Sequence, residues 1–321
     1  MKKKLTLGIL IGGALAYLSI RGIHFQDVLD GFSLIRYEYT WPPLLIFFFM
    51  QVLRSWRWGI ILSPLEKIDQ LSLFSVTNVG FFAIVAIPAR IGELARPYLI
   101  TKKSQIKMSA ALGTVFVERI FDCLAVLAIF FSVLLLIPLP AWLIRASVVF
   151  FIITLLLLSI MIVTIVKRDE SVRVLSFFLN KLPERYAVKV INCVNYVIDG
   201  FAVIRDLKRF IAVLLLSAAI WLINGAAIYI LFLAFNFTLP PVAAFALLVI
   251  LMIGIAIPTA PGFVGNWHYF CIIGLSLFGI SKTDALTFAV IYHFLSIGIV
   301  IFLGIIFLPF NRFSFSELYD K

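Results

Sequence analysis

Charged residues are scarce in this chain, and acidic ones are the scarcer sign. Only 13% of the 321 residues are Asp, Glu, Lys or Arg, whereas 63% are hydrophobic and the mean hydropathy is +1.12. Soluble domains carry about 25% charged residues, so a water-exposed globule is excluded. The formal net charge is +11. In so apolar a chain this excess fits the Lys/Arg bias of cytoplasmic membrane loops, and no nucleic-acid partner is expected.

Motifs for several kinds of chemistry are also missing. The three cysteines, Cys123, Cys193 and Cys271, are far apart in sequence, so no disulfide, metal site or other cofactor is expected. No GxxxxGKS or GxxxxGKT motif occurs, so we expect any active transport to draw on an ion gradient or on a downhill lipid supply. The chain has no Asp-x-Asp pair, and no segment suits a soluble catalytic domain.

Long apolar runs occupy most of the chain. A transmembrane helix needs about 20 apolar residues to cross a hydrocarbon layer of about 30 Å. Six runs are predicted as full transmembrane helices: residues 5–20, 41–62, 108–137, 141–166, 210–237 and 283–308. A signal peptide is the alternative for the first run, but its apolar stretch continues past the cleavage-like Ala14–Ala16, so we expect a retained helix.

Two further apolar stretches, residues 71–87 and 240–257, run into proline and glycine. The first break contains Pro88 and Gly92, and the second contains Pro258, Pro261, Gly262 and Gly265. Proline removes a helical donor and glycine permits a chain reversal. In lipid, broken backbone survives only when it is buried in protein or lines a wet cavity. The sequence therefore predicts re-entrant helical hairpins over residues 71–100 and 240–279.

The chain also repeats itself weakly. Ala-Ile-Pro at 86–88 followed by Gly92 matches Ala-Ile-Pro at 256–258 followed by Gly262. We predict one all-α, polytopic membrane domain over residues 1–321. It contains a first repeat at 41–137 and a second at 210–308, each made of a span, a broken hairpin and a span. The two units would have opposite topology, which is the architecture of many secondary transporters.

Basic residues predict the orientation in the membrane. Most lie in segments that become cytoplasmic when the N-terminus is inside, which places both termini in the cytoplasm. We therefore expect a multi-pass protein of the cytoplasmic (inner) membrane of a bacterium or archaeon. Residues 167–209 are predicted as a basic cytoplasmic connector, in which residues 184–207 form an amphipathic helix lying on the membrane surface.

Ionisable residues also occur inside the predicted spans. Glu118, Arg119 and Asp122 begin about ten residues, or about 15 Å, into their helix, near the bilayer centre. Each charge there costs about 2.5–3.5 kcal/mol, so intramembrane charges usually mark a substrate or proton site. A self-neutralising cluster that pins helices together is the alternative. His293 lies at the matching depth of the second unit, and His268 lies near the second break.

Arginines near the inner ends of two segments have two interpretations each. Arg90, Glu93 and Arg96 are spaced by three, so two guanidiniums could bind a phosphate while the carboxylate orients one of them. An interface helix with snorkelling arginines is the alternative. For Arg54 and Arg57 we expect a snorkelling position beside an aromatic belt.

These segments resemble a known family. Pro88-Ala89-Arg90-Ile91-Gly92-Glu93 with Arg96, and Glu118-Arg119 with Asp122, are similar to the P-x-R-x-G-E…R and E-R-x-x-D signatures of the flippase-like transmembrane domain of lysylphosphatidylglycerol synthases. Pro261-Gly262-x-x-Gly265 and Tyr292 resemble that domain's second half. The family usually has Glu at the position of His268 and Arg at that of His293. Members are linked to lipid translocation, and this chain has no counterpart of their synthase domain.

The resemblance and the intramembrane charges together predict a translocator of a phosphate-bearing lipid or lipid-linked headgroup. We expect headgroup contacts from Arg90, Arg96, Arg119 and Tyr292, and charge balance or proton coupling from Glu93, Glu118, Asp122, His268 and His293. The expected partner is a phospholipid or polyprenyl-phosphate-linked lipid, and a lipid-modifying synthase is a further candidate. The alternatives are a membrane transferase using polyprenyl-phosphate-linked donors, a proton-coupled transporter of small anions, and a non-catalytic subunit.

Overall fold

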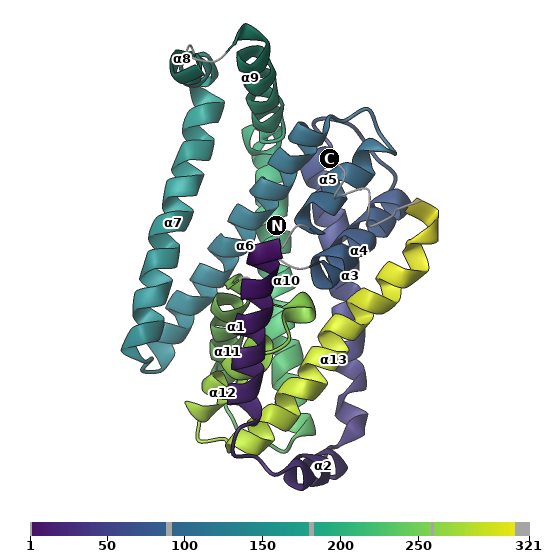
Figure 1. The fold of residues 1–321 in the computed structure, drawn as a ribbon, viewed down its shortest axis with the longest axis vertical. Helices are drawn as coiled ribbons and strands as arrows, with labels where there is room; N and C mark the ends of the chain where they lie inside the picture. The colour runs from purple at the N-terminus through teal and green to yellow at the C-terminus, as the bar shows by residue number, and fades with distance from the viewer. Residues whose placement is uncertain (1, 88–91, 180–182, 258–259, 312–321) are drawn as a thin grey trace.

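The computed structural model describes residues 2–87, 92–179, 183–257 and 260–311, with side chains from residue 8 onward. Every regular element in these ranges is helical (Figure 1). The α-helices are α1 Lys2–Ile20, α2 Phe25–Ser33, α3 Trp41–Leu62, α4 Gln70–Ala86, α5 Ala95–Thr101, α6 Met108–Leu136, α7 Ala141–Val166, α8 Arg168–Leu179, α9 Glu184–Asp199, α10 Leu207–Ala234, α11 Pro241–Ala256, α12 Asn266–Ser276 and α13 Lys282–Phe307. Short 3-10 helices include η1 Tyr37–Tyr39, η3 Ala202–Arg205, η4 Pro261–Phe263 and η5 Pro309–Asn311.

Five of these helices, namely α3, α6, α7, α10 and α13, are long and apolar enough to cross a membrane. The first predicted span differs, because α1 meets the length test only together with α2, from which it is bent by 75°. The bend contains Gly22 at φ +77°, a conformation that glycine adopts without strain. The prediction of an all-α polytopic membrane protein is confirmed, with five spans or six if the bent pair counts as one.

Both predicted hairpins consist of two helices on either side of a break. In the first, α4 begins at the cap Asp69, which accepts a 2.7 Å hydrogen bond from Ser72 N and whose pKa this bond lowers. The chain returns as α5, and α4 packs against α5 as α11 packs against α12. Gly92 lets the returning chain approach α4, since a Cβ there would lie 2.2 Å from Ala83 O. Pro88, Arg90 and Pro258 lie outside the described residues.

Helix α1 packs against the second break. Gly265 has φ +93°, and a Cβ on it would lie 2.0 Å from Gly12 O in α1. Within the break, Gly262 has φ +68°. Only glycine combines this backbone with so close an approach, which explains why the Pro-Gly-x-x-Gly sequence occurs here. The first helix of the chain therefore lies directly on the second hairpin.

The packing of helices relates the two predicted repeats. Helix α3 packs against α10, α4 against α13, and α6 against α11. Further contacts join α3 to α4 and α13, and α10 to α11 and α6. The predicted repeats relate α3 to α10, α4 to α11 and α6 to α13. When each helix is replaced by its counterpart, the contact between α3 and α10 stays the same, and each of the other contacts becomes another member of the set. Helices α3 and α10 are antiparallel, since Arg36 N, just before α3, donates to Ala234 O at the end of α10. This pattern is what an inverted duplication produces, while the orientation of the units to a membrane stays a prediction.

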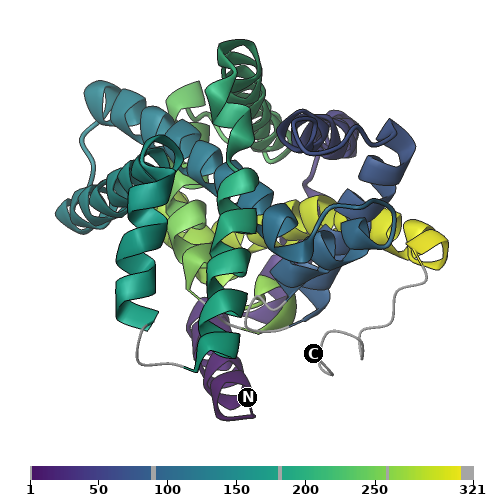
Figure 2. The same ribbon diagram turned by 90° about the horizontal axis from the view of Figure 1, so that it is seen from above.

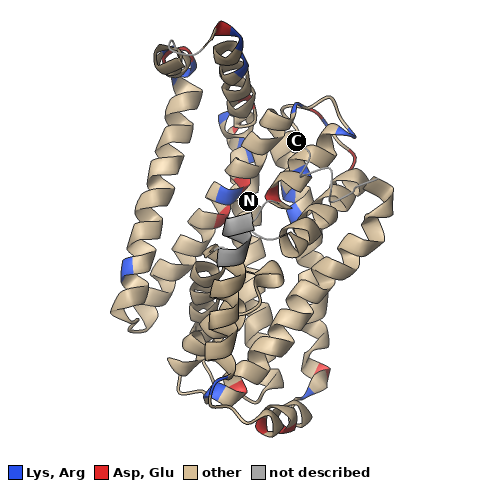
Figure 3. Cartoon of the chain, viewed as in Figure 1, with Lys and Arg blue, Asp and Glu red and all other residues tan. Residues whose placement is uncertain are grey.

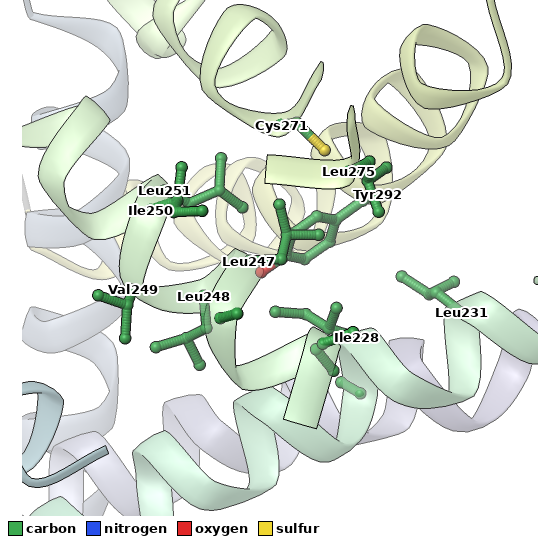
Figure 4. Close-up of a cluster of buried hydrophobic side chains, with 14 of the residues drawn as sticks. Ile228, Leu231, Leu247, Leu248, Val249, Ile250, Leu251, Cys271, Leu275 and Tyr292 are labelled. Atoms are coloured by element: carbon green, nitrogen blue, oxygen red, sulfur yellow. The ribbon is translucent and has the colours of Figure 1, made fainter. Parts of the chain in front are cut away.

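Each hairpin packs in its own hydrophobic core. One core joins α10, α11, α12 and α13 and contains Leu247, Cys271 and Tyr292 (Figure 4). The other surrounds the first hairpin and contains Leu73, Leu99 and other residues of α3 to α6. Seen from above, α13 (yellow) lies beside the blue helices of the first hairpin, in agreement with its packing against α4 (Figure 2).

The predicted connector contains α8 and α9. Helix α9 ends at Asp199 and is followed by η3, and Figure 1 shows it running along the long axis of the molecule toward α10. It packs against the start of α6, where a Cβ on Gly113 would lie 2.3 Å from Val197 O. The reason is that two glycines, Gly113 and Gly200, let these backbones touch. Most of α9 remains exposed, with Ile198 as its buried residue, so its placement on a membrane surface stays a prediction.

The described cysteines test the predicted orientation. Cys193 on α9 is exposed, whereas Cys271 on α12 is buried. If the connector is cytoplasmic, a membrane-impermeant maleimide will label Cys193 in inverted vesicles and not in intact cells, while Cys271 stays unlabelled until the protein is denatured. A Cys193→Ser variant serves as the control for specificity. Labelling of Cys193 in intact cells would place the connector outside and overturn the predicted topology.

Candidate functional site

Four charged side chains pair inside the bundle. Arg96 on α5 donates two hydrogen bonds to the Glu118 carboxylate on α6, at 2.8 and 3.0 Å. Arg57 on α3 donates to Asp122 at 2.6 and 3.3 Å and lies 3.2 Å from Glu118. Figure 3 shows this interior group of charges apart from those at the helix ends. Because Glu118 and Asp122 are one turn apart, the two carboxylates share one face of α6.

The network also reaches the second predicted repeat. Trp221 Nε1 on α10 donates to Asp122 Oδ1 at 3.0 Å, and Arg57 Nη1 donates to Ser217 Oγ at 2.8 Å. Helices α3, α5, α6 and α10 are thus tied at one point. The two arginines and two carboxylates balance in charge, which fits the rule that buried charges must be paired.

Aromatic rings and one glycine position Arg96. Its guanidinium carbon lies 4.2 Å from the centre of the Trp58 ring and 5.2 Å from that of Phe81. Gly80 on α4 leaves the path for its aliphatic stem, since a Cβ on Gly80 would lie 2.0 Å from Arg96 Cγ. Trp58 is itself fixed by a hydrogen bond to Thr114 on α6. Cation–π contact and bidentate pairing together hold the guanidinium in one orientation.

A cavity of about 470 Å³ lies beside this network. Its charged lining residues are Arg54, Glu93, Arg119 and Asp122. Apolar residues of α3, α4, α6, α7, α11 and α13 form most of the remaining wall. Gln51, Asn224, Trp267 and Tyr292 add polar atoms to it. The cavity therefore lies between the two predicted repeats and combines one charged region with a large apolar surface, as ligand sites for amphipathic molecules do.

The two arginines that line the cavity, Arg54 and Arg119, make weaker contacts with carboxylates than Arg57 and Arg96 do. Arg54 Nη1 donates to Gln51 Oε1 at 2.9 Å, its guanidinium lies 4.8 Å from the Phe81 ring centre, and it forms no ion pair with any described residue. Arg119 contacts Asp122 at 3.5 Å, and its side chain is 36% exposed. Arg57 and Arg96, by contrast, are 1% exposed and closely paired. Arg54 and Arg119 are therefore the cations that the cavity offers to a ligand.

Residues of the second repeat form the opposite side of the site. Tyr292 donates to Asn224 at 3.3 Å, and its ring centre lies 5.0 Å from that of Trp267. His293 Nε2 lies 2.7 Å from Gly262 O, so this ring holds the second break. The His268 and His293 ring centres are 5.0 Å apart. Within the described ranges, no cluster of three His, Cys, Asp or Glu side chains could hold a metal ion.

The structure separates the predicted site residues into groups. Arg119, Tyr292, Glu93 and Asp122 line the cavity, whereas Arg96 and Glu118 lie in the buried network beside it. His268 and His293 lie together near the second break, where Pro261, Gly262 and Gly265 occur. Gly92 lies between α4 and α5, and Arg90 is outside the described residues.

Sequence reasoning missed two residues of this region. The expected snorkelling position is wrong for Arg57, which is 1% exposed and paired with two carboxylates, because its helix turns this side chain toward α6 and not toward the membrane surface. Arg54 lines the cavity instead of reaching the aromatic belt. Gln51, Arg54 and Trp58 follow one another at intervals of three and four residues. This spacing places the three side chains on one face of the helix, and it is the pattern by which the sequence indicates that Arg54 faces other helices.

Comparison with known proteins places the chain in a family. The family model of the lysylphosphatidylglycerol synthase TM region matches residues 5–316, so the chain belongs to this family of multi-pass membrane proteins. A UPF0104 membrane protein of Methanocaldococcus jannaschii is 26% identical over 232 residues, covering 70% of this chain and 93% of that protein. A UPF0104 membrane protein of Methanothermobacter thermautotrophicus is 24% identical over 339 residues, covering all of both chains. No solved structure matches.

The close approach at Gly80 predicts a sensitive position. Gly80→Val should displace Arg96 and leave Glu118 buried with one partner fewer, since a Cβ there lies 2.0 Å from Arg96 Cγ. Overpacking alone costs about 1–3 kcal/mol. The midpoint of thermal unfolding in detergent should fall clearly for Gly80→Val and stay near wild type for Gly298→Val, because a Cβ on Gly298 meets nothing within 4 Å. Equal stability of the two variants would contradict the role of Gly80.

The buried ion pairs make a second stability prediction. Arg57→Met removes a guanidinium that contacts both carboxylates, and breaking a buried pair in this way costs about 3–5 kcal/mol. Removing Asp122 as well, in Arg57→Met with Asp122→Leu, should restore part of the loss, because one uncompensated charge disappears. A double-mutant cycle on thermal unfolding measures this coupling. Additive losses would show that the two side chains do not depend on each other.

Proposed function

We propose that this protein moves a phosphate-bearing lipid headgroup across the membrane through the cavity between its two repeats. The observation that carries the proposal is the pairing pattern of the arginines. Arg57 and Arg96 are closely paired with the buried carboxylates, whereas Arg54 forms no ion pair with a described residue and Arg119 makes a single 3.5 Å contact with Asp122. Guanidinium groups bind phosphate through paired N–H donors, so these two suit an anionic headgroup.

The position of helix α7 supports a lipid in preference to a small soluble anion. Val149 and Ile153 line the cavity, and they are 56% and 49% exposed. Only 11% of the apolar window of α7 is buried, so this helix would face hydrocarbon along most of its length. A cavity that borders such a helix gives a headgroup access from the side while its chains remain in the membrane.

Family membership supports the same direction, since the matching region is the membrane part of lysylphosphatidylglycerol synthases. Family membership does not identify a substrate, so the choice of substrate rests on the cavity. Glu93 and Asp122 would balance the cavity arginines when the headgroup is absent. Movement would follow from rocking of the two inverted units about the cavity, as in other transporters built from such repeats.

Substituting the cavity arginines tests this function. Arg54→Gln and Arg119→Gln should each slow lipid movement by about tenfold or more, since a hydrogen bond to a charged group contributes about 1.5–3 kcal/mol. The assay uses proteoliposomes with fluorescent phospholipid or polyprenyl phosphate and a membrane-impermeant quencher outside. Arg145→Gln is the matched control, because Arg145 is an exposed arginine on α7 that does not line the cavity.

Two results would overturn the proposal. Wild-type rates in folded, inserted Arg54→Gln and Arg119→Gln proteins would remove the cavity from the mechanism. Failure of the wild-type protein to move any lipid, with or without a pH gradient, would contradict translocation itself. Uptake of inorganic phosphate by the same sealed liposomes would then identify a transporter of small anions. Absence of both activities would favour a transferase or a non-catalytic subunit.

A further inference from the structure

Helix α8 presents large apolar side chains that the rest of the described chain leaves uncovered. Val174, Phe177 and Phe178 are 59%, 71% and 72% exposed. The rings of the two phenylalanines lie against each other, with their centres 5.7 Å apart. All residues of α8 are described, and none of them is buried. Exposed apolar side chains that gather in one place mark a surface that contacts a partner or a membrane.

The position of α8 follows from the end of α7, which is one of the helices long and apolar enough to cross a membrane. Only Lys167 separates the two helices. Its carbonyl oxygen accepts a 2.9 Å hydrogen bond from Ser171 N, so Lys167 begins the first turn of α8. Figure 1 shows α8 end-on, whereas α7 runs along the long axis of the view. A helix that lies across the end of a span has the direction of the membrane surface.

The helical period shows which side of α8 carries the apolar side chains. Val174 and Phe178 follow Lys167 by seven and eleven residues, which places each of them within about 20° of Lys167 around the helix axis. Because α7 joins α8 at Lys167, these two side chains lie on the side of α8 from which α7 arrives. The charged residues Asp169 and Arg173 lie on the opposite side. The apolar side of α8 therefore faces the layer that α7 occupies.

Contacts with α9 fix the rotation of α8 about its own axis. Arg168, the first residue of α8, donates to Asn195 Oδ1 at 3.0 Å and to Asp199 Oδ1 at 2.8 Å, and the two helices pack together. Turning the apolar side of α8 away from the layer of α7 would break these hydrogen bonds. The orientation of Val174 and Phe178 is therefore built into the connector.

We propose that α8 is an interfacial helix, which inserts Val174 and Phe178 between the headgroups and acyl chains of the membrane that α7 crosses. The partner is the lipid surface itself, because the apolar side of α8 faces the layer around α7, and only 11% of the apolar window of α7 is buried by protein. Lys167 then lies at the level of the headgroups, where lysine meets phosphate. Since Val149 and Phe150 of α7 line the cavity, α8 also holds this wall of the cavity at a fixed depth.

Spin labels on two sides of α8 test this placement. Phe178→Cys and Ser176→Cys are each introduced into the full-length Cys193→Ser protein, labelled with a nitroxide and reconstituted in vesicles of dioleoyl phosphatidylcholine and dioleoyl phosphatidylglycerol. Electron paramagnetic resonance compares collisions with oxygen, which concentrates in hydrocarbon, and with a water-soluble nickel chelate. We expect the label on Phe178→Cys to lie about 5–10 Å below the phosphates, as the apolar face of an interfacial helix does, and the label on Ser176→Cys to lie in water.

Controls and contrary outcomes are equally direct. The Cys193→Ser protein measures labelling of Cys123 and Cys271, and Val174→Cys supplies a second apolar position if Phe178→Cys does not fold. Equal access of nickel to the labels on both sides would overturn the proposal, because α8 would then lie in water. Exclusion of both nickel and oxygen from the apolar side would overturn it as well, since a protein surface, such as a second copy of the chain, would cover that side. The depth is measured without any lipid movement, so this result does not depend on the proposed function.

Discussion

The pairing of two arginines with two carboxylates inside an apolar bundle is the constraint on which this structure depends. Arg57, Arg96 and Glu118 are almost fully buried and Asp122 is 11% exposed, so each charge must meet an opposite one. That requirement fixes how α3, α5 and α6 approach one another. Because Asp122 also accepts from Trp221, the same requirement extends to α10 and so joins the two predicted repeats.

Neighbouring charged residues of α6 differ in their surroundings, since some are buried in the network and others reach the cavity. Glu118 is fully buried and bonded to Arg96, whereas Arg119, the next residue, points about 100° away around the helix and reaches the cavity. Asp122 takes part in both arrangements, since it binds Arg57 and lines the cavity. A ligand that attracts Arg119 therefore competes with the contact between Arg119 and Asp122. This links occupancy of the cavity to the group that holds the helices together.

The broken hairpins explain why a cavity exists at this place. A continuous helix satisfies its own backbone, but a helix that stops at proline and glycine leaves polar groups that must be buried or wet. The second break is covered by other elements, because α1 lies on it through Gly12 and Gly265, and His293 Nε2 donates to Gly262 O. Residues of the core around the second hairpin, such as Val249 and Trp267, line the cavity together with charged residues of the first half of the chain.

The sequence by itself determined the helical class, the positions of the spans and the two breaks, because apolar length, proline and glycine act locally along the chain. It also located charges at the depth of the membrane centre and, through Glu118, Arg119 and Asp122, the family. It did not determine which arginine pairs with which carboxylate. The sequence pattern predicts a surface position for Arg57 and a ligand contact for Arg96, whereas both side chains pair with buried carboxylates. Only the tertiary structure decided this, because pairing depends on the rotation of each helix about its axis and on the space that Gly80 leaves for one side chain.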